Sequence, residues 1–123
     1  MSTMTAERSV HDPVAVEQKI EETANRIAAG VKIVTGCEKE MKARKRDFDL
    51  AYANAYKNAE GSIKDREYAA DIKTMPHREI ADNAEIAYKH ATRTADALEK
   101  ELFAWQAILK SVNAMYGAAG VRG

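Results

Sequence analysis

The side chains best suited to chemistry in this sequence are the cations between Glu38 and Arg46. The stretch holds five basic residues and two acidic ones. Lys39, Lys42 and Arg46 are spaced three and four residues apart, so on an α-helix they share a face and could contact neighbouring phosphates. The stretch therefore predicts a candidate nucleic-acid contact, made by Lys39, Lys42, Arg44, Lys45 and Arg46.

Two tyrosines, Tyr52 and Tyr56, follow these cations within a few helical turns. Tyrosine rings beside cations can stack on single-stranded bases, so we include both as candidates. The alternative is an ordinary solvated helix face with ion pairs to nearby acids, and tyrosines that pack near a turn. Since 19 basic and 19 acidic residues cancel, the chain has no global field that attracts DNA or an anionic membrane. Any nucleic-acid contact would be local.

Other reactive side chains form no recognisable site. His77 and His90 would lie about 20 Å apart along one helix, and His11 is distant in sequence, so a metal site within one chain is not expected. Cys37 has no neighbouring base that could activate it as a nucleophile, and we interpret it as a small packing residue. We expect no cofactor, no metal, no catalytic residue and no enzymatic activity.

A heptad repeat of small and apolar residues marks the stretch from Ala81 to Tyr116. One set of positions holds Ala81, Tyr88, Ala95, Leu102, Leu109 and Tyr116, and the set three residues later holds Ala84, Ala91, Leu98, Trp105 and Val112. Alternating spacings of three and four place the whole set on one stripe of an α-helix. The stretch predicts one long helix that buries this stripe against a partner.

The partner is predicted in the first half of the chain. Asp12 and Pro13 are typical of a helix start, because proline lacks the N–H that would have no acceptor there. One set of core positions is Ile20, Ile27, Val34, Met41, Phe48 and Ala55, and the other is Glu17, Ala24, Val31, Glu38, Lys45, Tyr52 and Ala59. The repeat survives Gly30 and Gly36, which favours one bent helix; a break near Gly36 stays open as the alternative.

Turn signals separate the two helices. Gly61 suits the left-handed residue that closes a helix, and Ser62 with Asp65 resembles a capping box that opens the next one. Pro76 removes a backbone hydrogen bond, so a kink or a short break with Thr74 as cap is expected near residues 73–76. Gly117 and Gly120 are expected to end the second helix.

These signals predict an all-α fold, a long antiparallel two-helix hairpin of coiled-coil type with a kink near Pro76. We expect a flexible tail over residues 1–12, a hairpin over 13–117 (helix 13–60, turn 61–62, helix 63–116) and a second tail over 118–123. Folding about Gly61 would place Lys45 near Glu79 and Asp82, and Glu38 near Glu85 and Lys89.

Such a rod has a thin, alanine-rich core, and apolar residues outside the repeat suggest a second contact face. We therefore expect dimerisation into a four-helix bundle. The candidate interaction face is Ile80, Ile86, Phe103 and Trp105. Trp105 also lies on the heptad stripe, where a core position is the ordinary interpretation. The oligomeric order stays open.

The single cysteine and the lack of a recognisable signal peptide predict a reducing, cytoplasmic location. The apolar runs are far shorter than the roughly 20 residues that cross a bilayer, so no membrane partner is expected.

The segment Ala51–Ser62, which reads AYANAYKNAEGS, resembles a pattern A-Y-x-x-A-(Y/F)-x-x-A-(E/D)-G-S. This pattern occurs in a family of small, largely uncharacterised helical proteins of actinobacterial phages and prophages. The likeness covers about residues 40–120, and Met75-Pro76 departs from the uninterrupted helix expected of relatives. Members are often encoded in early gene regions near recombination and replication functions. The resemblance implies a location in a bacterial host cell and no particular activity.

Three functions remain open from the sequence. The first is a phage accessory protein that acts beside DNA recombination or replication as an adaptor or weak nucleic-acid binder. The second is an adaptor or inhibitor directed at a host defence or replication protein, and the third is a structural or assembly component. All three are binding functions.

Overall fold

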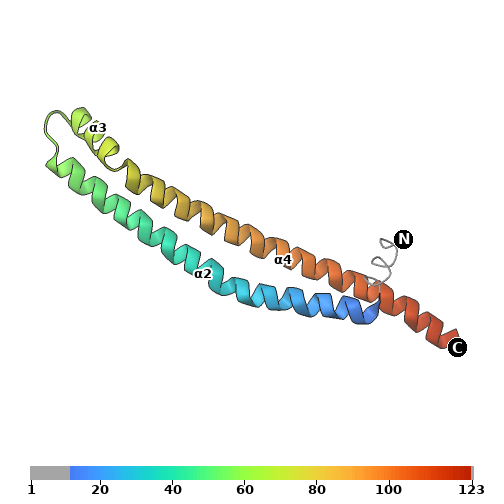
Figure 1. The fold of residues 1–123 in the computed structure, drawn as a ribbon. Coiled ribbons are helices and arrows are strands. Elements are labelled where there is room, and N and C mark those ends of the chain that lie inside the picture. Colours follow the sequence, from blue (N-terminus) through green and yellow to red (C-terminus); the bar gives the residue numbers. More distant parts are fainter. Residues whose placement is uncertain (1–11, 123) are drawn as a thin grey trace, which may run out of the picture. The chain divides into compact units, whose positions relative to one another are not determined.

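The computed structural model describes residues 12–122, with side chains up to residue 117, and over this range it is all-helical. The helices are α2 (Pro13–Asn58), α3 (Ile63–Lys73) and α4 (Met75–Arg122) (Figure 1). The predicted all-α class is confirmed. Of the predicted N-terminal tail, residues 1–11 lie outside the described residues.

Two compact units make up the described chain. Unit 1 contains residues 12–31 and 94–122, and unit 2 contains residues 32–93. Both α2 and α4 contribute to each unit, whereas α3 and the turn belong to unit 2.

The first helix, α2, begins at Pro13 as predicted. The carbonyl of Asp12 accepts a hydrogen bond from the N–H of Val16 at 2.9 Å, which closes the first turn. The helix continues through Gly30 and Gly36 to Asn58, so the alternative of a break near Gly36 is wrong. A glycine inside a helix costs about 1 kcal/mol, which the rest of the helix can tolerate.

The turn follows the sequence signals closely, although α2 ends at Asn58 and not at residue 60. The N–H of Ala59 donates to the carbonyl of Tyr56, three residues earlier, and not to the residue four earlier as in an α-helix. Arg66 Nε donates to the Ala59 carbonyl. Gly61 has φ 105°, a left-handed conformation that favours glycine. The predicted capping box is confirmed: the Asp65 N–H donates to Ser62 Oγ, and the Ser62 N–H donates to the Asp65 carboxylate.

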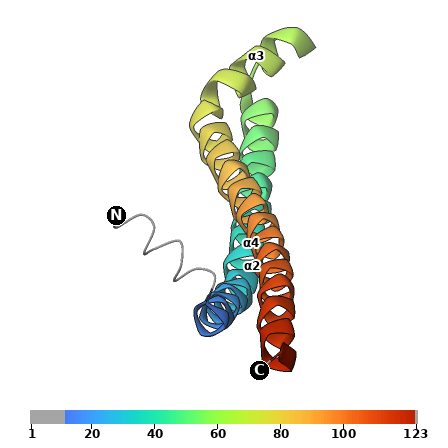
Figure 2. The ribbon, with the colours of Figure 1, turned by 90° about the vertical axis from the view of Figure 1, so that its right-hand side faces the viewer.

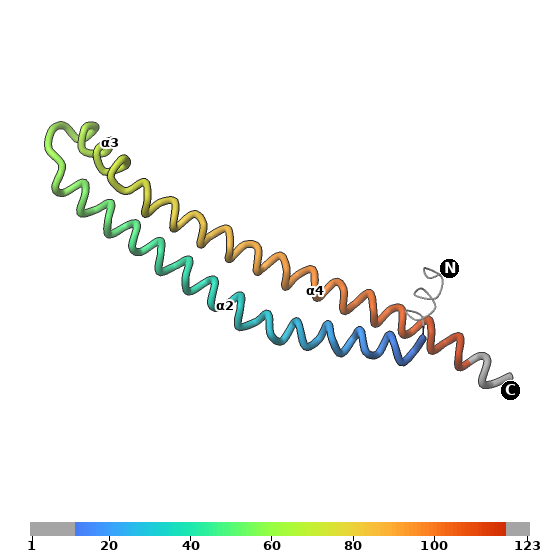
Figure 3. The backbone as a smooth tube through the Cα atoms, viewed as in Figure 1, coloured from blue at the N-terminus to red at the C-terminus, as the bar shows by residue number. Residues whose placement is uncertain are grey.

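The helix break predicted near Pro76 lies at Thr74. This residue is 2% exposed and joins α3 to α4. Both its N–H and its hydroxyl donate to the Ala70 carbonyl, at 3.0 and 2.7 Å, so the last turn of α3 is closed and its buried polar atoms are paired. The tube changes direction between α3 and α4 (Figure 3).

The C-terminal end of α4 differs from the prediction, because the helix runs to Arg122 and does not end at residue 116. The tail expected over residues 118–123 is therefore helical as far as residue 122. Gly117 and Gly120 weaken the helix without forcing a left-handed turn, and the two alanines between them are the strongest helix formers.

The heptad stripe on α4 is the buried stripe, as predicted. Every member from Ala81 to Val112 is buried or half-buried, Trp105 included. Tyr116, the last member, is 59% exposed. The ion pair between Arg26 and Glu101 shows the antiparallel register of unit 1, which places the start of α2 opposite about residue 114 of α4. The last member of the stripe therefore has no part of α2 beside it.

One of the two predicted core sets on α2 is wrong at four of its seven positions. The Ile20 set is buried or half-buried throughout, whereas in the other set Val31 is 62% exposed and Glu17, Ala24 and Lys45 are also exposed. The remaining members of that set, Glu38, Tyr52 and Ala59, are half-buried. The second inward set lies one residue earlier in the chain: Val16, Thr23, Gly30, Cys37, Arg44 and Ala51.

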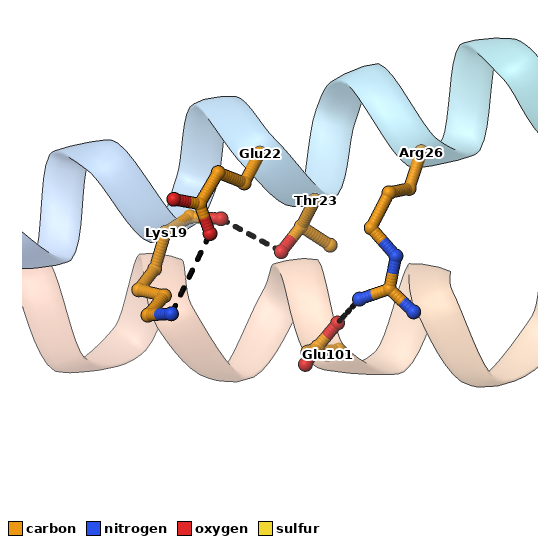
Figure 4. A network of polar contacts seen from close by, with 5 residues as sticks. All are labelled: Lys19, Glu22, Thr23, Arg26 and Glu101. Carbon is orange, nitrogen blue, oxygen red and sulfur yellow. Dashed lines mark hydrogen bonds and ion pairs between the residues drawn. The ribbon is translucent and has the colours of Figure 1, made fainter.

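A physical reason for this choice is visible at Thr23, which is 3% exposed. Its hydroxyl donates to the Lys19 carbonyl at 2.7 Å, so its burial leaves no unpaired polar group (Figure 4). The alternative set would have put the charged groups of Glu17 and Lys45 into the core. The predicted role of Cys37 as a small residue in the packing agrees with its half-buried position.

Antiparallel packing is seen inside each unit. In unit 2, Lys45 pairs with Glu85, and Tyr88 donates to Glu38. In unit 1, Arg26 Nη1 lies 3.4 Å from Glu101 Oε2 (Figure 4), and the two helices run side by side in Figures 1 and 2. Glu38 lies in its predicted neighbourhood, since Tyr88 is between Glu85 and Lys89 in the chain. Lys45 pairs with Glu85, about one helical turn beyond the predicted Asp82.

Candidate functional site

The predicted basic stretch lies in unit 2, on the middle of α2, and its five cations fall into two groups. Lys39, Lys42 and Arg46 are exposed and form no ion pair within residues 12–122. Arg44 and Lys45 are engaged in ion pairs with residues of the same unit. Only the first group is available to phosphates without breaking an existing contact.

Arg44 belongs to the inward set of α2 and is held along its own helix. Its Nε lies 3.4 Å from Glu40 Oε1, outside hydrogen-bond geometry, and its Nη1 lies 3.4 Å from Asp47 Oδ2. These are the intrahelical pairs that the alternative interpretation of the basic stretch describes.

Lys45 reaches across to α4, where its Nζ donates to Glu85 Oε1 at 3.1 Å. This hydrogen bond, followed by the charges of Lys45 and Lys89, lowers the pKa of Glu85. Both side chains are at least one-third exposed, so the pair contributes little to stability. It does fix which α4 residue faces Lys45.

The two candidate tyrosines are also engaged within unit 2. The guanidinium of Arg66 lies 5.2 Å from the ring centroid of Tyr56, and the same side chain bonds the Ala59 carbonyl in the turn. The ring of Tyr52 packs against Phe48 with centroids 6.3 Å apart and planes inclined by 54°. Neither tyrosine lies beside the three exposed cations as an open stacking surface, so the structure does not unite the predicted set into one site.

A crevice in unit 2 gathers groups that the sequence analysis did not connect. It has a volume of about 330 Å³ and is lined by Phe48, Asp49, Tyr52, Asp71 and Arg78. α2 supplies the first three residues, and the last two come from either side of the break at Thr74.

Arg78 is the central cation of this crevice. Its guanidinium lies 5.3 Å from the ring centroid of Phe48, and its Nη2 is 3.3 Å from Asp71 Oδ1. Asp71 and Arg78 are seven residues apart and belong to different helices. The only hint in the sequence was the proline between them, which marks the break but not the contact.

Burial is the main reason that the pKa of Tyr52 is raised. The charges of Asp71 and then Glu67 raise it further, and Tyr56 adds to the effect, whereas Arg78 acts in the opposite direction. The carboxylates therefore outweigh the guanidinium at this hydroxyl.

The predicted interaction face is divided between the units. Ile80 and Ile86 lie on α4 in unit 2 and are exposed, but they are about 120° apart around the helix axis and do not share a face. Phe103 and Trp105 lie in unit 1, where Phe103 is 65% exposed and Trp105 is half-buried on the heptad stripe. Trp105 thus occupies the core position that was its ordinary interpretation.

Metal-binding side chains do not gather anywhere in residues 12–122. No group of three or more histidine, cysteine, aspartate or glutamate side chains is placed to hold a metal ion there. Across the same residues, no helix combines the length and the apolar character needed to cross a membrane.

Comparisons with known proteins return no match for this chain, whether to a family model, to a curated protein or to a solved structure.

Proposed function

We propose that this chain is a non-enzymatic helical adaptor that acts by binding another protein and by associating with itself. One observation carries the proposal: large apolar side chains are exposed to solvent on α4, the helix that also carries the buried heptad stripe. Ile86 is 63% exposed and Phe103 is 65% exposed on α4, while four of the ten buried or half-buried residues of its heptad stripe are alanine. These two side chains lie in different units, so the proposal takes each as a separate contact point for a partner.

Self-association is the first part of the proposal. Two chains would form a four-helix bundle that covers apolar groups that one chain leaves exposed. Sedimentation equilibrium over a range of concentrations measures this directly. We expect a dimer whose dissociation constant rises at least tenfold in Ile86→Glu or Phe103→Glu.

Matched controls exist on the same helix. Asn83→Glu and Ser111→Glu add the same charge at exposed polar positions of α4, one in each unit, and should leave the dimer intact. A monomer at all concentrations, or equal effects of apolar and control variants, would contradict self-association through these residues.

Partner binding is the second part, and the partner would be a phage protein or a host defence or replication protein. Wild-type protein and the Phe103→Glu and Ser111→Glu variants would be immobilised and exposed to lysate of an actinobacterial host. A specific partner should be retained by wild type and Ser111→Glu and lost with Phe103→Glu. If no lysate protein is retained in this pattern, the result would count against the adaptor function.

Nucleic-acid binding is the second candidate function, favoured by Lys39, Lys42 and Arg46, three exposed cations of the basic stretch that form no ion pair within residues 12–122. Fluorescence anisotropy with a labelled single strand would test it. Three phosphate contacts predict a slope of about −2 in a plot of log K against log salt concentration. Reversing Lys39, Lys42 and Arg46 to glutamate should abolish binding, whereas reversing Lys100 and Lys110 should not; no binding at low salt would remove this candidate.

A further inference from the structure

We propose that the crevice between α2 and the α3–α4 break binds an arginine side chain of a partner polypeptide. The inference rests on the proposed adaptor function and names the chemistry of its partner. The site is formed by Phe48, Asp49, Tyr52, Asp71 and Arg78.

The crevice already holds one guanidinium, which shows how it can hold another. Arg78 lies over the Phe48 ring at 5.3 Å and pairs with Asp71 at 3.3 Å, so a ring face and a carboxylate act on the same cation. This combination is the usual way in which proteins hold a guanidinium, because the cation is attracted by the ring face and its N–H groups fit a carboxylate.

A second carboxylate and a second ring also line the crevice, and the Tyr52 ring packs against Phe48. Asp49 lines the crevice, is exposed, and forms no ion pair within residues 12–122. Tyr52 lies beside it with an aromatic ring and a hydroxyl. An incoming guanidinium could therefore pair with Asp49 and lie against Tyr52 while Arg78 keeps its own contacts.

Charge decides the class of ligand. Two carboxylates and one guanidinium line the crevice, which leaves an excess of negative charge. The nearby carboxylate of Glu67 adds to it, as its effect on the pKa of Tyr52 indicates. Phosphates and carboxylates are therefore disfavoured and cations favoured. A planar guanidinium is favoured over an ammonium because it can stack on a ring and form parallel hydrogen bonds at once.

The test is an NMR titration of the full-length, isotope-labelled protein with the peptide acetyl-Gly-Arg-Gly-amide. The matched probe replaces arginine with citrulline, which is close in shape but neutral. We expect saturable shifts in residues 48–52 and 71–78 with the arginine peptide, and at least tenfold weaker binding of the citrulline peptide.

Two variants define the site. Asp49→Asn removes one charge from an exposed side chain and should weaken binding about two- to fivefold, the range of an exposed ion pair. Asp96→Asn is the control, since Asp96 is also exposed and forms no ion pair within the described chain but belongs to unit 1. Tyr52→Leu should weaken binding by a similar factor, with circular dichroism confirming that the helices remain.

Equal shifts with the citrulline peptide, shifts confined to other residues, or equal effects of Asp49→Asn and Asp96→Asn would overturn the proposal. Such results leave the adaptor function intact if partner retention still depends on Phe103, which lies in the other unit. Loss of that dependence, with the peptide titration positive, would refute the adaptor and leave the arginine site standing.

Discussion

The choice between the two possible inward faces of α2 can be tested with one pair of valines. Val16 is fully buried and Val14, two residues away on the same helix, is 60% exposed. Each would be changed to alanine. The pair shares residue type, helix and unit, so any difference in stability reports which side of the helix faces α4.

The size of the effect follows from the burial. Truncating Val16 removes two buried carbon groups, worth about 1.6 kcal/mol at about 0.8 kcal/mol each, and the cavity left behind adds to this. Alanine is the better helix former and returns roughly 0.5 kcal/mol. The net loss at Val16 is thus about 1.5–2 kcal/mol. At Val14 only the helix term remains, so the change should be neutral or slightly stabilising.

Thermal unfolding followed by circular dichroism at 222 nm measures the difference. The Tm shift per kcal/mol decreases with chain length, and this chain has 123 residues. We expect Val16→Ala to lower Tm by about 5–10 °C. All variants must be compared at one protein concentration, because self-association would make Tm depend on it. Equal melting temperatures, or a larger loss for Val14→Ala, would refute the assignment of Val16 and its heptad set to the core.

Three further predictions concern two glycines, the capping box and the ion pair between Lys45 and Glu85. Gly61→Ala should destabilise the fold by about 1–2 kcal/mol, because Gly61 has φ 105° and a Cβ there would lie 3.0 Å from the Asp65 carboxylate. Gly30→Ala should stabilise the fold by roughly 0.5–1 kcal/mol, because a Cβ at Gly30 would meet nothing within 4 Å. Denaturant unfolding of the two variants would show changes of opposite sign. Ser62→Ala should cost about 1 kcal/mol by loss of the capping box, and adding Asp65→Ala should cost less than a second independent loss; strict additivity would contradict a shared box. Lys45→Met should raise the pKa of Glu85 toward its ordinary value in an NMR titration, and the control Lys42→Met should not. The pKa of Glu85 is lowered in the folded state, so the stabilisation by this pair is present above the pKa of the unfolded state. It is lost as the pH falls through the pKa of the folded state.

The sequence alone determined the features that depend on local chemistry. Pro13, Gly61, Ser62 with Asp65, and Pro76 act through backbone geometry within a few residues, and each acts where it was expected to act. The heptad stripe of α4 was equally clear, because only one face of that helix combines apolar character with unbroken spacing.

The tertiary structure decided what the local signals left open. On α2, two candidate sets flank the Ile20 set, and heptad spacing alone does not choose between them. Thr23 can be buried because its hydroxyl is satisfied by its own helix. Gly117 did not end α4, since a helix can absorb a glycine when no turn requires one. The crevice escaped notice because Asp71 and Arg78 meet Phe48 only after the chain reverses and breaks. Contacts between residues distant in sequence depend on register, and register is set by the packing of whole helices.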